Sequence, residues 1–207
     1  MDFSTLCIHG NPDRYDRTGA VSVPIFQTAT FAHPGVGQST GYDYSRLQNP
    51  TREHLEKTVA QLEGGTDAMA FASGMSAIGA LMELFSPGDH VIASDDLYGG
   101  SYRLFRNIST KNGIAFDFVN TSDLKQIQSH IRPQTKAVLI ETPTNPMMQV
   151  TDIAAVSALA KRHGLLLIVD NTFLTPYYQK PLALGADIVI HSGTKFLGGH
   201  NDTLAGF

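Results

Sequence analysis

One cysteine and no tryptophan occur among the 207 residues of this chain. The single thiol, Cys7, cannot build a disulfide framework, and so little cysteine is typical of proteins kept in the reducing cytoplasm. The eight histidines are scattered without a pair at metal-ligand spacing, and no cysteine cluster joins them. The composition therefore predicts a cytoplasmic protein without a metal site.

Charge and long apolar runs are also scarce. Charged residues make up 16% of the chain and the formal net charge is −4, which disfavours broad binding to nucleic acids or anionic membranes. No apolar run reaches the length of a membrane span, and no basic segment followed by an apolar core opens the sequence. Hydrophobic residues make up 42%, which is ordinary for a globular protein and sufficient for one sizeable domain. We therefore expect neither nucleic acid nor a membrane as a partner.

Apolar runs typical of buried strands alternate with amphipathic segments from residue 67 onward. This alternation predicts an α/β fold, with a mostly parallel sheet flanked by helices, over residues 51–207. Residues 1–50 contain frequent glycine and proline and predict an extended arm. The predicted strands are 68–72, 90–93, 115–119, 137–140, 165–169 and 188–190, and the predicted helices are 50–63, 78–85, 101–111, 123–131, 152–163 and 181–184.

The most informative stretch follows the last predicted strand. Residues 188–190 predict a strand buried on both faces, and Ser192, Thr194 and Lys195 come directly after it. An amine held where a buried strand opens into a loop loses solvation, which favours its attack on a carbonyl. A lysine beside hydroxyls that can hold a phosphate suggests bound pyridoxal phosphate. The alternative for Lys195 alone is a solvated surface side chain.

A carboxylate ends the strand before it. Residues 165–169 are continuously apolar and Asp170 follows them. A carboxylate at this edge can keep a pyridine nitrogen protonated and so make the ring an electron sink. The alternative is that Asp170 merely caps the next helix, and spacing alone leaves both interpretations open.

Three earlier strand ends carry further groups suited to a cofactor. The Ser-Gly-Met turn at 73–75 offers backbone amides for an anion, although small residues at such turns also serve geometry alone. Tyr98 follows another strand, where its ring could stack on a planar cofactor, and Asn145 follows the next. The ends of parallel strands share one edge of a sheet, so these groups are predicted to converge. The turn lacks the G-x-G-x-x-G pattern, which argues against the alternative of another α/β nucleotide binder.

Together these motifs are recognisable. The sequence resembles the transsulfuration family of pyridoxal phosphate enzymes of cysteine and methionine metabolism, and the match covers essentially the whole chain. The resemblance implies a fold-type I, aspartate-aminotransferase-like large domain. The motifs that carry it are Tyr-Ser-Arg-x-x-Asn-Pro-Thr at 44–51, Ser-Gly-Met at 73–75, Glu-Thr-Pro-Thr-Asn-Pro at 141–146, Val-Asp-Asn-Thr-Phe at 169–173 and His-Ser-Gly-Thr-Lys-x-x-x-Gly-His at 191–200.

The resemblance also implies roles for single residues. Lys195 would form the Schiff base with pyridoxal phosphate and shuttle the proton, Asp170 would pair with the pyridinium nitrogen, and Tyr98 would stack on the ring. These three are the expected catalytic residues. The remaining cofactor contacts implied within the predicted domain are the backbone amides of Gly74 and Met75, the hydroxyls of Ser192 and Thr194, and the side chain of Asn145 at the phenolic oxygen or the substrate carboxylate.

In this family the N-terminal arm reaches a neighbouring subunit. Tyr44 and Arg46 would accordingly contact the phosphate of the partner's cofactor, because arginine suits bidentate phosphate recognition and tyrosine adds a hydroxyl. A surface pair without function is the alternative. The resemblance therefore implies self-association as a dimer, doubled to a tetramer, with amino acids as substrates.

Among the family's activities, the segment 98–104 favours cystathionine γ-synthase, which replaces the γ-substituent of an O-acylhomoserine with cysteine. The alternatives are cystathionine β-lyase, cystathionine γ-lyase, methionine γ-lyase and O-acetylhomoserine thiolyase. Family members are longer, so the C-terminal domain is expected to be absent from this chain. A processed or truncated piece that associates with longer partners, or is inert, is the non-enzymatic alternative.

Overall fold

The structure is a computed structural model that describes residues 2–10 and 19–207. The chain divides into two compact units, Met1–Ala70 and Phe71–Phe207. None of the helices in the described ranges is both long and apolar enough to cross a membrane.

The first unit holds the helices α1, Phe3–His9, and α2, Pro50–Glu63. Helix α2 begins as its sequence predicts: the Asn49 side chain accepts a hydrogen bond from the Thr51 amide at 2.9 Å, and Pro50 occupies the first turn. Gly64 ends it in the left-handed conformation, with φ of 75°. The short helix α1 was not expected within the predicted arm. Residues 11–18 of that arm lie outside the described residues, and its docking on a neighbouring subunit stays a prediction.

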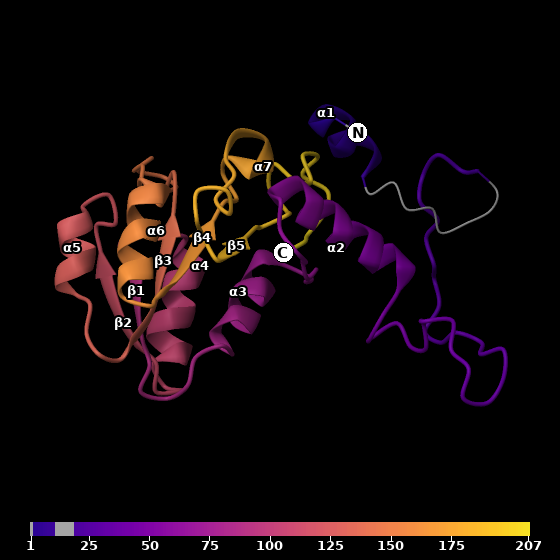
Figure 1. The fold of residues 1–207 in the computed structure, drawn as a ribbon, viewed down its shortest axis with the longest axis horizontal. Helices are drawn as coiled ribbons and strands as arrows, with labels where there is room; N and C mark the ends of the chain where they lie inside the picture. Colours follow the sequence, from indigo (N-terminus) through magenta and orange to yellow (C-terminus); the bar gives the residue numbers. More distant parts are fainter. Residues whose placement is uncertain (1, 11–18) are drawn as a thin grey trace. The chain divides into compact units, whose positions relative to one another are not determined.

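The second unit is a five-stranded parallel sheet with strand order β2-β1-β3-β4-β5, flanked by helices (Figure 1). The predicted α/β fold with a mostly parallel sheet is thereby confirmed. The elements are α3 Gly74–Met82, β1 His90–Ser94, α4 Gly99–Leu104, the π-helix η1 Phe105–Ser109, β2 Ala115–Val119, α5 Leu124–Ser129, β3 Thr135–Glu141, α6 Ile153–Arg162, β4 Leu166–Asp170, α7 Thr175–Tyr178 and β5 Ile188–Ile190.

Two apolar clusters form the core, one on each face of the sheet. Because side chains alternate along a strand, Val91 and Ala93 face α3 and η1, whereas Ile92 faces α5 and α6. The same alternation divides β3 and β4, so each strand is buried on both faces. This burial holds the strands in register and brings their carboxyl ends to one edge.

Two predicted elements are wrong. Residues 68–72 form no strand: Phe71 makes only an isolated antiparallel bridge with Gly206, through backbone hydrogen bonds of 2.8 and 2.9 Å. Residues 181–184 form hydrogen-bonded turns, and the helix of this region is α7, which begins earlier. The apolar run 68–72 predicts a strand, but its conformation depends on a partner that is distant in the sequence. The proline-containing run 181–184 predicts a helix, but local turn hydrogen bonds determine its conformation.

Phe105 gives a direct test of the core. Its ring is fully buried and stacks on Phe116, with centroids 4.8 Å apart. Phe105→Ala should lower the free energy of unfolding by about 3–5 kcal/mol, because it removes an aromatic ring and leaves a cavity. Urea denaturation measures this. The exposed Leu84 is the control: Leu84→Ala should change the same quantity by about 0.5 kcal/mol or less, and equal losses in both variants would contradict the packing.

Candidate functional site

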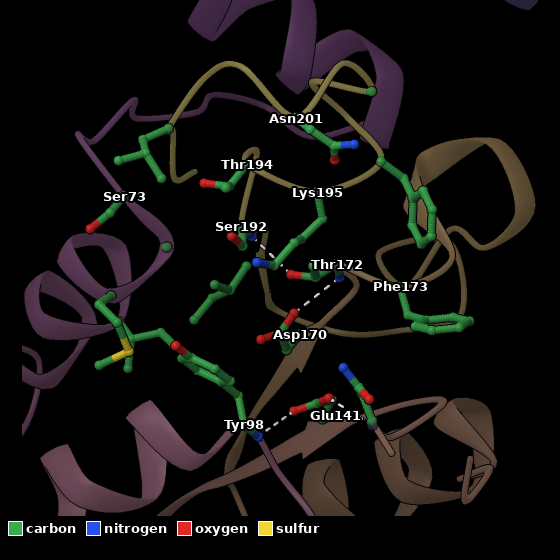
Figure 2. Close-up of a pocket in the computed structure, with 18 residues that line it drawn as sticks. Ser73, Tyr98, Glu141, Asp170, Thr172, Phe173, Ser192, Thr194, Lys195 and Asn201 are labelled. Carbon is green, nitrogen blue, oxygen red and sulfur yellow. Dashed lines mark hydrogen bonds between the residues drawn. The ribbon is translucent and has the colours of Figure 1, made fainter. Parts of the chain in front are cut away.

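A pocket of about 570 Å³ lies at the carboxyl edge of the sheet, and every residue that lines it belongs to the second unit (Figure 2). This volume is in the range of small-molecule and cofactor sites. The pocket brings together most of the candidates predicted from the sequence, namely Gly74, Met75, Tyr98, Asn145, Asp170, Ser192, Thr194 and Lys195.

The start of helix α3 forms one wall. The Ser73 hydroxyl caps the helix by accepting the Ser76 amide at 3.2 Å. No hydrogen bond within the described residues uses the amides of Gly74 and Met75, which is the normal state of a first helical turn and leaves two donors for an anion. A Cβ on Gly74 would stand 2.9 Å from the Cβ of Ser192, so only glycine permits this close approach.

The two hydroxyls after β5 are placed differently from each other. The Ser192 amide donates to the Thr172 hydroxyl at 2.8 Å, which fixes its backbone, and among the described residues no hydrogen bond engages the Ser192 hydroxyl. The Thr194 hydroxyl lines the pocket but is also held by the backbone of Ala205, accepting its amide at 3.2 Å. Thr194 therefore has a structural contact that the sequence did not predict.

Lys195 extends into the pocket from the loop after β5 (Figure 2). Within the described residues its amine makes no hydrogen bond or ion pair, so it is available to a ligand. The expectation that the amine is desolvated is wrong for this chain, because the Lys195 side chain is exposed.

Asp170 ends β4 at the base of the pocket (Figure 2). Its carboxylate accepts the amide of Thr172 at 3.0 Å, whereas the next helix, α7, begins after Leu174 without a side-chain cap. The alternative of a helix cap is therefore wrong. Burial raises the pKa of Asp170, and the Thr172 hydrogen bonds and His191 oppose that shift. A cation beside this carboxylate would offset the cost of burying its charge.

Tyr98 follows β1 and its ring faces the pocket beside Met75. Gly100 makes room for it: a Cβ there would lie 2.3 Å from the Cε1 of Tyr98 and 2.9 Å from the sulfur of Met75. Since both distances are below any real contact, the absence of a side chain at Gly100 sets the position of the ring.

Glu141 is the main residue that the sequence reasoning missed. It ends β3, lines the pocket, and accepts the amides of Tyr98 at 2.8 Å and Asn145 at 3.1 Å. Burial raises the pKa of Glu141 to about 7, with a further increase from the charge of Asp170. The sequence signal was its place at a strand end, the same signal that singled out Asp170.

Phe173 and Phe196 were also missed as pocket residues. Their rings meet edge to face with centroids 5.8 Å apart, and both residues line the pocket. Phe196 directly follows the predicted Lys195, and Phe173 comes three residues after the predicted Asp170; this proximity was the available signal. Thr172 and Asn201 complete the polar lining.

Tyr44 and Arg46 do not line the pocket. They belong to the first unit, where the guanidinium carbon of Arg46 lies 4.9 Å from the centroid of the Tyr44 ring. Both side chains are exposed. Their predicted contact with a partner's cofactor stays a prediction.

Comparisons with known proteins identify the family of this chain. Residues 4–207 match the family model described as Cys/Met metabolism PLP-dependent enzyme. The chain is 57% identical to a cystathionine gamma-synthase/O-acetylhomoserine (thiol)-lyase of Bacillus subtilis over 91% of its length and 51% of that protein. It is 52% identical to a cystathionine beta-lyase of Lactococcus lactis subsp. cremoris over 98% of its length and 53% of that protein.

A solved structure, cystathionine gamma-lyase from Lactobacillus plantarum complexed with L-serine, superposes with a TM-score of 0.96 at 49% identity. The superposition covers 100% of this chain and 54% of that structure's chain. The chain spans about half the length of the curated relatives it matches. The sheet matches the fold-type I large domain of these enzymes, and the chain belongs to the Cys/Met metabolism family of PLP-dependent enzymes.

Proposed function

We propose that the pocket binds pyridoxal phosphate and that this chain is the cofactor-binding part of a transsulfuration enzyme acting on amino acids. The observation that carries this proposal is the meeting in one cavity of a lysine amine, a half-buried carboxylate and two helix amides; the amine and the amides have no hydrogen-bond partner within the described residues. We expect Lys195 to react with the aldehyde of that cofactor and Asp170 to pair with its pyridine nitrogen. The amides of Gly74 and Met75 would bind its phosphate.

The residues present fit this group chemically. The phosphate suits the amides of Gly74 and Met75 and the hydroxyl of Ser192, with Thr194 sharing its hydroxyl with Ala205. The raised pKa of Asp170 shows an unfavourable buried charge, which a protonated pyridine nitrogen would stabilise. The Tyr98 ring offers a flat face for the cofactor ring.

When bound, pyridoxal phosphate supplies an electron sink for negative charge at the substrate's α-carbon. This chain's residues supply the rest. Lys195 Nζ would take up the α-proton and return it, because no carboxylate among the described residues forms an ion pair with it. Asp170 holds its negative charge at the base of the pocket, Tyr98 orients the ring, and Asn145 offers an amide to the phenolic oxygen or the substrate carboxylate.

For the particular reaction we propose cystathionine γ-synthesis. In that reaction the thiol sulfur of cysteine bonds to the γ-carbon of an O-acylhomoserine, and the acyl group leaves as a carboxylate. The segment 98–104 and the 57% identity to the Bacillus subtilis gamma-synthase support it. The beta-lyase and gamma-lyase relatives keep those two activities as alternatives. Self-association, with Tyr44 and Arg46 reaching a partner's cofactor, belongs to the same proposal.

Product analysis distinguishes these reactions. The protein with pyridoxal phosphate is incubated with cysteine and an O-acylhomoserine, and in parallel with cystathionine alone. A γ-synthase should form cystathionine in the first mixture at a rate well above any cleavage in the second. Faster release of homocysteine from cystathionine would favour the β-lyase, and faster release of cysteine the γ-lyase. Mass spectrometry of the products gives the answer.

Borohydride reduction tests the cofactor site. After incubation with pyridoxal phosphate and reduction, peptide mass spectrometry should find a pyridoxyl group on Lys195, because its amine faces the pocket and has no partner in the part of the chain that the structure describes. Lys195→Ala should lose this modification, whereas the exposed Lys136→Ala should retain it. Modification spread evenly over surface lysines, or none at all, would contradict a pocket that binds the cofactor.

Gly100 and Gly99 form a matched pair on α4. A Cβ at Gly100 collides with the Tyr98 ring, whereas one at Gly99 meets nothing within 4 Å. Gly100→Ala should therefore displace the ring and weaken pyridoxal phosphate binding by about fivefold to tenfold, the value of one aromatic contact. Gly99→Ala should leave the affinity unchanged. Equilibrium dialysis measures both, and equal affinities would argue against a role for Tyr98 in stacking.

A further inference from the structure

Glu141 joins two loops that follow different strands. Its Oε2 accepts the Tyr98 amide from the loop after β1 at 2.8 Å, and its Oε1 accepts the Asn145 amide from the loop after β3 at 3.1 Å. Figure 2 shows the first of these bonds at the base of the pocket. Both amides belong to residues whose side chains line the cavity. One carboxylate thus sets the backbone at two places on the pocket wall.

The chemistry of the contact requires a carboxylate. Two N–H donors approach the two oxygens, and an ionised carboxylate is an acceptor at both. Glutamine would accept at its oxygen only, and its NH2 group would face the second N–H donor. Aspartate would shorten the reach by one methylene and lose at least one bond.

Glu141 occupies this place at an electrostatic cost. It is 8% exposed, and the charges of Asp170 on β4 and Asp96 in the loop after β1 both oppose its ionisation. The two amides favour the charged form. A buried charge beside another carboxylate does not help to complete strand β3. The hydrogen bonds to the amides of Tyr98 and Asn145 therefore offset the cost of burying the Glu141 charge.

The surroundings hold Glu141 itself in place. Its amide donates to the Ser94 hydroxyl at 3.3 Å, and Ser94 bonds the Thr121 hydroxyl at 2.8 Å inside the core. The same two loops are tied a second time, because the Thr144 hydroxyl donates to the Asp96 carboxylate. The Glu141 carboxylate therefore acts from a rigid position.

We propose that Glu141 is a positioning residue, which fixes Tyr98 and Asn145 on the pocket wall by accepting both of their backbone amides. We call this contact the carboxylate clamp. The clamp is a property of the chain without any ligand. Its consequence for pyridoxal phosphate, which is weaker binding when the clamp is lost, rests on the proposed function.

A pH titration of the ¹⁵N-labelled 207-residue chain, without cofactor, tests the clamp in the wild type. The pKa of Glu141 is raised to about 7, so below that pH one oxygen carries a proton and accepts weakly, and above it both accept fully. The amide proton resonances of Tyr98 and Asn145 should move downfield together with a common midpoint near pH 7. Asp96→Asn should lower that midpoint, since the Asp96 charge raises the pKa of Glu141. Independent or absent titration of the two amides would overturn the clamp.

Substitution of Glu141 gives a second test of the clamp. In Glu141→Gln the common titration should disappear, and the amides of Tyr98 and Asn145 should exchange with solvent about tenfold faster, as expected for a lost charge-assisted hydrogen bond. Glu83→Gln is the matched control, because Glu83 is exposed and does not line the pocket. A general loss of stability would speed exchange of many core amides, whereas loss of the clamp should be confined to these loops. Unchanged exchange at both amides in Glu141→Gln would overturn the proposal.

Pyridoxal phosphate affinity separates the two proposals. If Glu141→Gln binds the cofactor several-fold more weakly while Glu83→Gln binds as wild type, the clamp serves the cofactor site. If the wild-type amides titrate together but no protein binds pyridoxal phosphate, the clamp stands and the proposed function fails for this chain. If the wild type binds and Glu141→Gln binds equally well, the positioning role is overturned. Should Glu141→Gln not fold, the wild-type and Asp96→Asn titrations decide.

Discussion

Parallel pairing of buried strands is the constraint on which the site depends. In a parallel sheet every strand ends at the same edge, so residues that are distant in sequence must meet there. Strands β1, β3, β4 and β5 deliver Tyr98, Glu141, Asp170 and Lys195 to one cavity in this way. The apolar cores on both faces fix the register, and the register fixes which side chains face the cavity. The chemistry of the pocket is therefore a consequence of core packing.

Close backbone approaches refine this edge. Gly74 lets the start of α3 reach Ser192, and Gly100 lets the Tyr98 ring lie against α4. Asp170 and Glu141 are register partners at the ends of β4 and β3, and burial raises the pKa of both. Within the described residues, the pocket thus combines amide donors that have no hydrogen-bond partner with carboxylates whose ionisation is unfavourable unless a cation lies beside them. That combination favours a ligand with an anionic end and a cationic ring, which is the charge pattern proposed for the cofactor.

Sequence reasoning succeeded where strong local signals existed. Continuous apolar runs marked β1, β3, β4 and β5, and the polar residues directly after them marked most of the pocket. It failed where tertiary contacts decide: residues 68–72 have no strand partner beyond Gly206, and the Thr194 hydroxyl is drawn to Ala205. Glu141 was missed although it ends a predicted strand, because its role is set by hydrogen bonds to two amides from separate loops. The exposure of Lys195 was likewise beyond local patterns.

The central claim is that Asp170 and the edge around it form a site for pyridoxal phosphate. Calorimetric titration of the cofactor into the wild type and into Asp170→Asn tests it most directly, because the substitution keeps the shape and removes the charge. We predict one equivalent bound per wild-type chain and binding at least about tenfold weaker in the variant, as expected for loss of a buried charge partner. Equal affinities, or no binding by the wild type, would contradict the account.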